Sequence, residues 1–436
     1  MPMRDPLVRP ITQAVQDVLA AESERRAAAG EPGLPTAAQQ ALALRTVQRE
    51  LATLDEARLR EGAPRLSRAD EDRITAAVLA AATGLGPVDV LLADESIEEI
   101  AATRHDLVWT YHADGRVEQL EQTPWASEAE LAEWISFVAR TKGRTERQFN
   151  AQHPLLVMRI GEGLRLAATR DVAQHVTFSL RRNRLGKVDL ADLVGLGMFP
   201  PVLGDLFRAF SLAHEMRWVV SGATSAGKTT LVRAMLHELP PSRRLVVIED
   251  TAEIDAFDDV LHPNVESWEH REPNSEGQGE IAIGELVAHG LRYRPDLLTV
   301  GECRDSATAV PMLKAMTHGQ SSATTVHAYD ARGGLDKLAL FLGTGVDQIP
   351  LAAAHHQLSQ AVDFLVHVDR GHDGRRFVSE VVEVAGFDGE RVTTNTIYEA
   401  DSAATPGHTL NRLTDAHAAR LARAGFDPSA LGSVWR

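Results

Sequence analysis

Residues 221–236 read SGATSAGKTTLVRAML and directly follow the apolar segment Arg217–Val220. From Gly222 to Thr229 they fit the pattern G-x-x-x-x-G-K-[ST], placed between a predicted strand and a predicted helix, which is the context this pattern requires. The glycines let successive backbone N–H groups face one point, and the dipole of the following helix adds positive potential there. The stretch therefore predicts a phosphate-binding loop.

The residues of this loop have separate expected tasks. Lys228 bridges the β- and γ-phosphates of a nucleoside triphosphate, Thr229 ligates Mg²⁺, and Thr230 lies behind the α-phosphate. A chance match in an ordinary glycine turn is rare in a chain of this length, on the order of one per cent at average residue frequencies. The sequence thus predicts ATP and Mg²⁺ as ligands and assigns phosphate binding to Gly222, Ala223, Thr224, Ser225, Ala226, Gly227, Lys228, Thr229 and Thr230.

Composition excludes several classes of protein. The chain has 436 residues and a formal net charge of −16. This charge is spread along the sequence and offers no basic face, which argues against direct nucleic-acid binding. The single cysteine, Cys303, excludes an intramolecular disulfide and suits a reducing cytoplasm. The N-terminus lacks the apolar core of a signal peptide, and no apolar run is long enough to span a bilayer. We therefore expect a cytoplasmic protein.

The pattern of apolar residues divides this α/β chain into five parts. Helical spacing dominates the beginning, short strand-like runs around one helix come next, and strands then alternate with helices as in a mostly parallel sheet. The predicted parts are a helical N-terminal extension (1–75), a smaller α/β domain (76–185), a linker (186–205), the domain with the phosphate-binding loop and a C-terminal hairpin (206–400), and a tail with a helix (401–436).

Acidic residues follow two of the predicted buried strands. Leu297–Val300 is apolar and is followed by Glu302, whereas Leu245–Ile248 is followed by Glu249 and Asp250. The carboxyl ends of parallel strands form the edge of a sheet where ligands bind. One such acid is more often a turn or cap residue, but two beside a phosphate-binding loop favour a catalytic role. Glu302 is the candidate for polarising the attacking water, and the second strand offers carboxylates for Mg²⁺ or its waters.

A histidine ends a third predicted strand. The run SSATTVHA places His327 at the same edge of the sheet, where an imidazole can sense the γ-phosphate. Taken alone, such a histidine is more often structural.

Four motifs occur along the chain in a fixed order. They resemble the P-loop, the acidic box, the Walker B motif and the histidine box of the secretion ATPases that drive type II, type IV and tight-adherence pilus machines. The upstream stretches GLGPVDVLLADESIEEI and GLRLAATRD and the downstream stretch GRRFVSEVVEVAGF resemble the tight-adherence, CpaF-like branch, so the resemblance covers about residues 84–400. The four motifs are SGATSAGKTTL, VIEDTAEI, HGLRYRPDLLTVGECRD and MTHGQSSATTVHA.

The resemblance implies an architecture and a function. It implies a RecA-like P-loop NTPase domain behind a smaller N-terminal domain, assembled as a homo-hexameric ring on the cytoplasmic face of the inner membrane. Its implied function is an ATP-hydrolysing motor for pilus assembly or protein secretion. The implied partners are cytoplasmic loops of inner-membrane pilus or secretion platform proteins, with peripheral membrane association only and no direct nucleic-acid contact.

The resemblance also implies roles for single residues. Glu302 is the implied catalytic base and His327 the histidine-box sensor, while Glu249 belongs to the acidic box. Arginines of the N-terminal domain contact the nucleotide in this family, and Arg165 and Arg181 fall at similar places. The implied catalytic set is Glu302, Glu249, His327 and Arg181, the implied metal ligands are Thr229, Glu249 and Glu302, and Arg165 joins the nucleotide-binding residues.

Some features depart from the family pattern, and other functions stay open. The histidine box usually begins Gly-His, whereas this chain has His318-Gly319, and residues 1–75 lie outside the resemblance. A nucleic-acid translocating motor of the same superfamily is one alternative, which stimulation of turnover by single-stranded DNA would reveal. A nucleotide-binding scaffold without hydrolysis is another, to be separated by phosphate release. A small-molecule kinase is disfavoured because the sequence shows no separate pocket for a phosphate acceptor.

Overall fold

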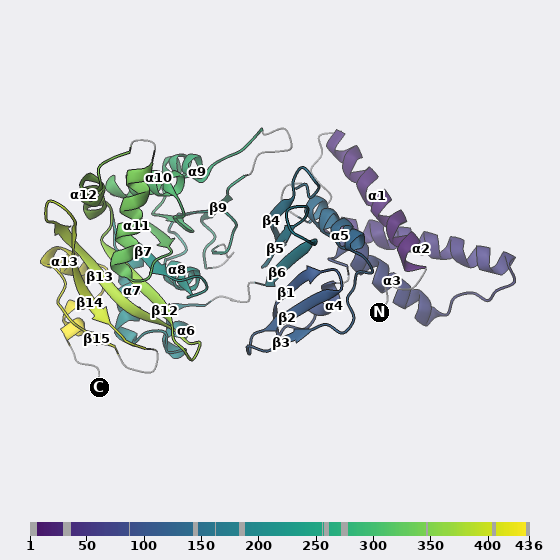
Figure 1. The fold of residues 1–436 in the computed structure, drawn as a ribbon, viewed down its shortest axis with the longest axis horizontal. Coiled ribbons are helices and arrows are strands. Elements are labelled where there is room, and N and C mark those ends of the chain that lie inside the picture. The colour runs from purple at the N-terminus through teal and green to yellow at the C-terminus, as the bar shows by residue number, and fades with distance from the viewer. Residues whose placement is uncertain are drawn as a thin grey trace. The chain divides into compact units, whose positions relative to one another are not determined.

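The computed structural model separates the chain into two compact units, Met1–Arg184 and Leu185–Arg436 (Figure 1). Each unit is described by itself. Of the described residues, no helix has the length and apolar character to cross a membrane. The structure describes residues 7–28, 36–86, 88–142, 147–161, 163–182, 188–254, 256, 261–271, 278–345, 348–402 and 407–432.

The first unit begins with three helices that share one small core. They are α1 (Val8–Ala28), α2 (Thr36–Arg60) and α3 (Arg68–Thr83), and α3 begins at the N-cap Ser67, whose side chain accepts a hydrogen bond from the N–H of Asp70. Helix α3 runs past residue 75, the expected end of the extension. The core of the three helices is formed by fully buried aliphatic side chains: Val15, Val47, Ile74 and Val78.

The remainder of the first unit is an antiparallel sheet with a covering helix. The strand order is β3-β2-β1-β6-β5-β4. Helix α5 (Glu128–Thr141) packs its buried side chains Leu131, Ile135 and Val138 into the core of this sheet. The elements are α4 (Val88–Leu92), β1 (Ile97–Arg104), β2 (Leu107–His112), β3 (Val117–Gln119), β4 (Leu155–Ile160), β5 (Leu164–Thr169) and β6 (Thr177–Arg182).

The second unit is built on a nine-stranded sheet. Its order is β15-β14-β13-β12-β7-β11-β10-β8-β9, and all neighbours from β12 to β9 are parallel, which confirms the mostly parallel sheet predicted from the sequence. The hairpin expected around Asp388-Gly389 joins β13 to β14. The strands are β7 (Arg217–Gly222), β8 (Leu245–Glu249), β9 (Val265–Glu269), β10 (Leu297–Val300), β11 (Ser322–Val326), β12 (Phe364–Arg370), β13 (Arg376–Phe387), β14 (Val392–Glu399) and β15 (His408–Thr409).

Helices cover both faces of this sheet (Figure 1). Along β7 the side chains alternate, so Trp218 and Val220 enter one core and Val219 enters the other. One face carries α6 (Leu190–Gly195), α7 (Pro201–Leu212), α8 (Lys228–His237) and α13 (Asp415–Arg423); the other carries α9 (Ile283–Gly290), α10 (Ser306–Thr317), α11 (Ala331–Thr344) and α12 (Leu351–Ala361). The short 3₁₀ helices are Leu291–Tyr293 and Pro428–Gly432.

The residues expected to form a linker pack into the second unit. Leu190, Leu193, Phe199 and Leu203 are buried in the core that α7 and α8 share, because the apolar side chains of this stretch fall on one face of α6 and α7. Of the expected linker, residues 186 and 187 lie outside the described part of the chain.

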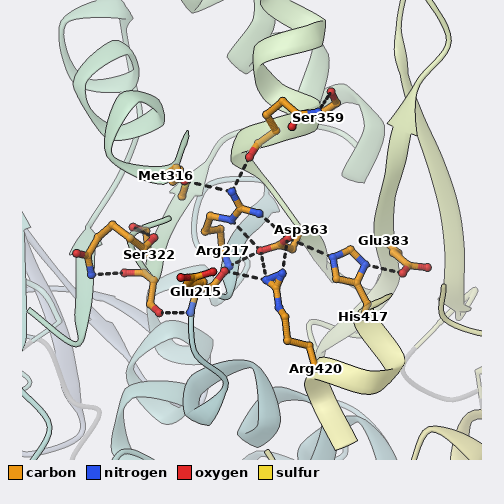
Figure 2. A network of polar contacts seen from close by, with 12 residues as sticks. Glu215, Arg217, Met316, Ser322, Ser359, Asp363, Glu383, His417 and Arg420 are labelled. Carbon is orange, nitrogen blue, oxygen red and sulfur yellow. Dashed lines mark hydrogen bonds and ion pairs between the residues drawn. The ribbon is translucent and has the colours of Figure 1, made fainter. Parts of the chain in front are cut away.

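The tail beyond residue 400 also packs onto this unit. Leu421 of α13 is fully buried in the same core. Figure 2 shows the polar contacts of this helix, where His417 and Arg420 of α13 both contact Asp363, which precedes β12. Asp363 also pairs with Arg217, which begins β7. The tail is therefore an integral part of the second unit.

Candidate nucleotide-binding site

The loop between β7 and α8 has the backbone of a phosphate cradle. Gly227 is the N-cap of α8 with φ of 103°, and Ser225 also has a positive φ of 61°. At Gly222, where φ is 154°, an added Cβ would lie 2.3 Å from the carbonyl oxygen of Val368. Only glycine fits this position, because the neighbouring strand β12 comes so close. The loop therefore ends at the N-terminus of helix α8, where free backbone N–H groups favour the binding of an anion.

Lys228 is folded back onto this loop. Its Nζ donates to the carbonyl oxygens of Gly222 at 3.1 Å and Ala223 at 2.9 Å. The residue is only 7% exposed, and burial lowers the pKa of the ammonium group to about 8. Thr229 and Thr230 follow in the first turn of α8 and are half-buried. A phosphate group that replaced the two carbonyl oxygens would compensate the ammonium charge more fully.

One histidine joins the loop to the expected base. Nδ1 of His327 lies 3.1 Å from Nζ of Lys228, and Nε2 lies 2.9 Å from Oε1 of Glu302. A neutral ring with its proton on Nε2 suits both neighbours, since Nδ1 then accepts from the ammonium group. Burial and then the Lys228 charge lower the pKa of His327, which favours that neutral form.

Glu302 is held from its other side by an arginine that the sequence analysis did not single out. Nε of Arg304 donates to Oε2 of Glu302 at 3.0 Å, and Nη1 donates to Oδ2 of Asp250 at 2.9 Å. The acids expected at the ends of β10 and β8 are thus joined through one guanidinium group. The available signal was the GECRD run, in which Arg304 stands two residues after the expected base.

Glu249 takes a different place from Asp250. It is 5% exposed, and its Oε1 accepts hydrogen bonds from the N–H groups of Glu253 and Ile254, both at 3.0 Å. Burial raises the pKa of its carboxyl group to about 7. The structure therefore gives Glu249 the task of holding the turn after β8, while Asp250 is the acid that connects to Glu302.

The two expected arginines belong to the first unit. Arg165 of β5 lies directly opposite Arg181 of β6, and on its other side it lies opposite Arg159 of β4. Directly opposed residues share one face of a sheet, so three guanidinium groups form a row there. Glu99 of β1 lies directly opposite Arg181 on its other side, so this row of side chains ends at a carboxylate.

His318 lies far along the chain from the loop. It is the C-cap of α10, and its Nδ1 lies 2.6 Å from the carbonyl oxygen of Lys314 in the same helix. Helix α10 starts just after Glu302 and has 12 residues, so about 18 Å of helix separates its two ends. The structure brings His327, and not His318, to the Glu302 side chain.

The chemistry of the loop and of Glu302 suits Mg²⁺. No group of three or more His, Cys, Asp or Glu side chains able to hold a metal occurs among the described residues. Mg²⁺ bound with a nucleotide needs only one or two protein oxygens, since phosphate and water fill its other positions. Oε1 of Glu302 is buried and accepts no well-aligned hydrogen bond from the described residues. Oε1 lies 2.9 Å from Nε2 of His327, and the Thr229 hydroxyl is the expected direct ligand of Mg²⁺.

The sequence matches a family model described as "Type II/IV secretion system protein" over residues 81–368. A Mycobacterium tuberculosis protein named for conjugal transfer is 34% identical over 327 residues, which cover 73% of this chain and 89% of that protein. The type IV secretion system protein VirB11 of Bartonella henselae is 26% identical, covering 60% of this chain and 80% of that protein. Both similarities extend beyond the phosphate-binding loop.

One solved structure supports the same fold. The pilus retraction motor PilT with bound ADP matches with a TM-score of 0.50 and 18% identity, covering 68% of this chain and 80% of that chain. At this identity the match concerns the fold alone, which is the RecA-like fold expected from the sequence.

Proposed function

Because the chain belongs to the type II/IV secretion system protein family, we propose that it is an ATP-hydrolysing motor that powers pilus assembly or protein secretion. One observation supports this most: the ammonium group of Lys228, the imidazole of His327 and the carboxylate of Glu302 form one contact chain beside the loop. A binding scaffold needs the loop alone. A carboxylate placed at the γ-phosphate edge adds what hydrolysis requires.

The residues divide the work of hydrolysis among them. The backbone N–H groups of the loop and Lys228 hold and orient the phosphates, and the Thr229 hydroxyl holds Mg²⁺, which neutralises phosphate charge when bound. Glu302 accepts a hydrogen bond from the attacking water and takes its proton as the water attacks the γ-phosphorus in line. The bond from the γ-phosphorus to the β–γ bridging oxygen breaks in the same step, and ADP leaves. His327 contacts the ammonium group of Lys228 and the carboxylate of Glu302, and it senses whether the γ-phosphate is present.

The assembly and its place in the cell are part of the proposal. The chain acts as a homo-hexamer of the tight-adherence branch, bound peripherally at the cytoplasmic face of the inner membrane to platform proteins. Arg165 and Arg181, which lie opposite each other on the sheet of the first unit, are the proposed nucleotide-contacting arginines, since guanidinium groups bind phosphate oxygens.

Phosphate release from ATP by the full chain tests this function. We expect Mg²⁺-dependent turnover that Lys228→Ala abolishes, since the variant loses the cation placed at the β- and γ-phosphates. Single-stranded DNA should leave the rate unchanged, because the chain carries a net charge of −16. Turnover by Lys228→Ala at the parent rate would contradict the assigned site, and strong stimulation by DNA would favour a nucleic-acid motor.

A further inference from the structure

A line of polar side chains crosses the carboxyl edge of the second unit's sheet. Beyond the contacts of Lys228 and His327 with Glu302, Arg304 connects Glu302 to Asp250. Nδ1 of His270 then lies 3.4 Å from Oδ1 of Asp250. The line follows the spatial order of the strands, β7, β11, β10, β8 and β9, and not their order along the chain. Its members, in that order, are Lys228, His327, Glu302, Arg304, Asp250 and His270.

Arg304 is the bridge in this line. Its guanidinium group donates from two different nitrogens to two carboxylates on neighbouring strands, at 3.0 Å and 2.9 Å. Arginine suits this task because its planar fork fixes the direction of each N–H, whereas a lysine ammonium group fixes none. The side chain of Arg304 is 50% exposed and that of Glu302 is 18% exposed, so the contact joins a half-exposed arginine to a more buried carboxylate.

Glu302 therefore lies between the His327–Lys228 pair on one side and Arg304 on the other. On one side His327 and Lys228 attract Oε1, and on the other side Arg304 binds Oε2. Without the arginine, the carboxylate is free to turn toward the lysine and histidine. A general base must lie within hydrogen-bond reach of the proton it takes, and a misplacement of about 1 Å costs up to about 10²-fold in rate.

We propose that Arg304 is a positioning residue for hydrolysis: anchored by Asp250, it holds the Glu302 carboxylate in the orientation from which it accepts the proton of the attacking water. This inference rests on the proposed ATPase function. Asp250 is contacted in turn by His270, whose Nδ1 lies 3.4 Å from its other carboxylate oxygen just after β9. The hydrogen bonds and ion pairs of Arg304 go to Glu302 and Asp250, so it acts through Glu302.

Steady-state kinetics of the full chain and nucleotide affinity test this role. We expect Arg304→Gln to lower kcat by about 10- to 100-fold while KM and the Kd for a non-hydrolysable ATP analogue stay within about threefold. Arg304→Lys should recover part of the loss, because it keeps one charged donor. The matched control is Arg243→Gln. Arg243 pairs with Asp296 at 2.9 Å near the amino ends of the same two strands, so its loss should leave kcat unchanged.

A double-mutant cycle separates positioning from a general structural effect. In single-turnover measurements, Glu302→Gln combined with Arg304→Gln should be no more than about twofold slower than Glu302→Gln alone. Three results would overturn the proposal: wild-type kcat in Arg304→Gln, an equal loss in Arg243→Gln, or a full multiplicative loss in the double variant. If the ATPase function itself were wrong, the parent chain would release no phosphate, and this is measured before any variant.

Discussion

The imidazole of His327 lies between Lys228 and Glu302, with Nδ1 3.1 Å from Nζ of Lys228 and Nε2 2.9 Å from Oε1 of Glu302. One ring thus joins the phosphate-binding loop to the expected base. A γ-phosphate that attracts Lys228 away from the carbonyl oxygens also changes what Nδ1 contacts. The proposed role of His327 as a sensor of the γ-phosphate rests on these two contacts.

We predict that His327→Ala lowers ATP turnover at least about tenfold while nucleotide affinity stays within a few fold. His318→Ala serves as the control and should have a milder effect, because His318 contacts the Lys314 carbonyl at the far end of α10. Turnover and nucleotide binding of the two single variants check this ranking. A larger loss at position 318 than at 327 would show that the displaced histidine has kept the family role.

Gly222→Ala should disrupt the loop. The substitution forces a side chain into a positive φ of 154° and places Cβ 2.3 Å from the Val368 carbonyl oxygen. Backbone strain of this kind costs about 1–3 kcal/mol, and the clash adds to it. Urea unfolding of Gly222→Ala beside Gly389→Ala isolates the clash, since Gly389 has φ of 108° with no atom within 4 Å of the added Cβ. Equal destabilisation of both variants would mean that β12 moves aside.

Arg181→Glu should impair ATP hydrolysis and leave the fold of the first unit intact. The change replaces one guanidinium group of the row with a carboxylate opposite Arg165, so it weakens the site for an anion. Because the phosphate-binding loop belongs to the other unit, we expect activity only where units or subunits come together, and a monomer should be nearly inactive. Specific activity and oligomeric state are measured across a dilution series. Equal activity in a confirmed monomer would contradict this.

The contact of the tail helix should depend on pH. Burial alone would lower the pKa of His417, but hydrogen bonds to Asp363 and Glu383 raise it above its usual value (Figure 2). A group with a raised folded-state pKa contributes its full stability below its unfolded pKa of about 6.5, and this contribution is lost as the pH rises through the folded pKa. A tenfold difference in proton affinity between the folded and unfolded chain corresponds to about 1.4 kcal/mol.

Urea unfolding of the parent chain and His417→Asn between pH 6 and 9 measures this contribution. The difference in the free energy of unfolding should be largest at pH 6 and should shrink as the pH rises, because asparagine has no proton to lose. Asp363 keeps its charge over this range, since its hydrogen bonds and ion pairs with His417, Arg217 and Arg420 lower its pKa to about 2 although burial opposes this. A difference that stays constant with pH would exclude a charged His417.

Much of the site could be predicted from the sequence, because several of its motifs consist of a few consecutive residues. The loop from Gly222 to Thr229 and the acid after Leu297–Val300 each depend on a few consecutive residues, and the structure places them at one sheet edge. The contact between Arg304 and Asp250 could not be predicted from the sequence. It requires β8 and β10 to be neighbours, although 47 residues separate Glu249 from Leu297 along the chain.

Tertiary packing also determined the places of residues whose local sequence pattern did not determine them. The stretch at Leu190–Gly195 looked like part of a linker because it is short and flanked by glycine and proline, yet its leucines are buried under the sheet. Glu249 and Asp250 are adjacent in sequence, and the resemblance gave Glu249 the role in the acidic box. The turn after β8 points Glu249 inward to backbone N–H groups and leaves Asp250 for Arg304.

The most direct measurement compares ATP binding and phosphate release in the parent chain and in Glu302→Gln. If Glu302 takes the proton of the attacking water, the variant binds ATP with parent affinity but turns over at least about a hundredfold more slowly, since general-base steps contribute about 10²- to 10⁴-fold. Near-normal turnover in Glu302→Gln would contradict the assignment and would transfer the role of the base to Asp250 or Glu249.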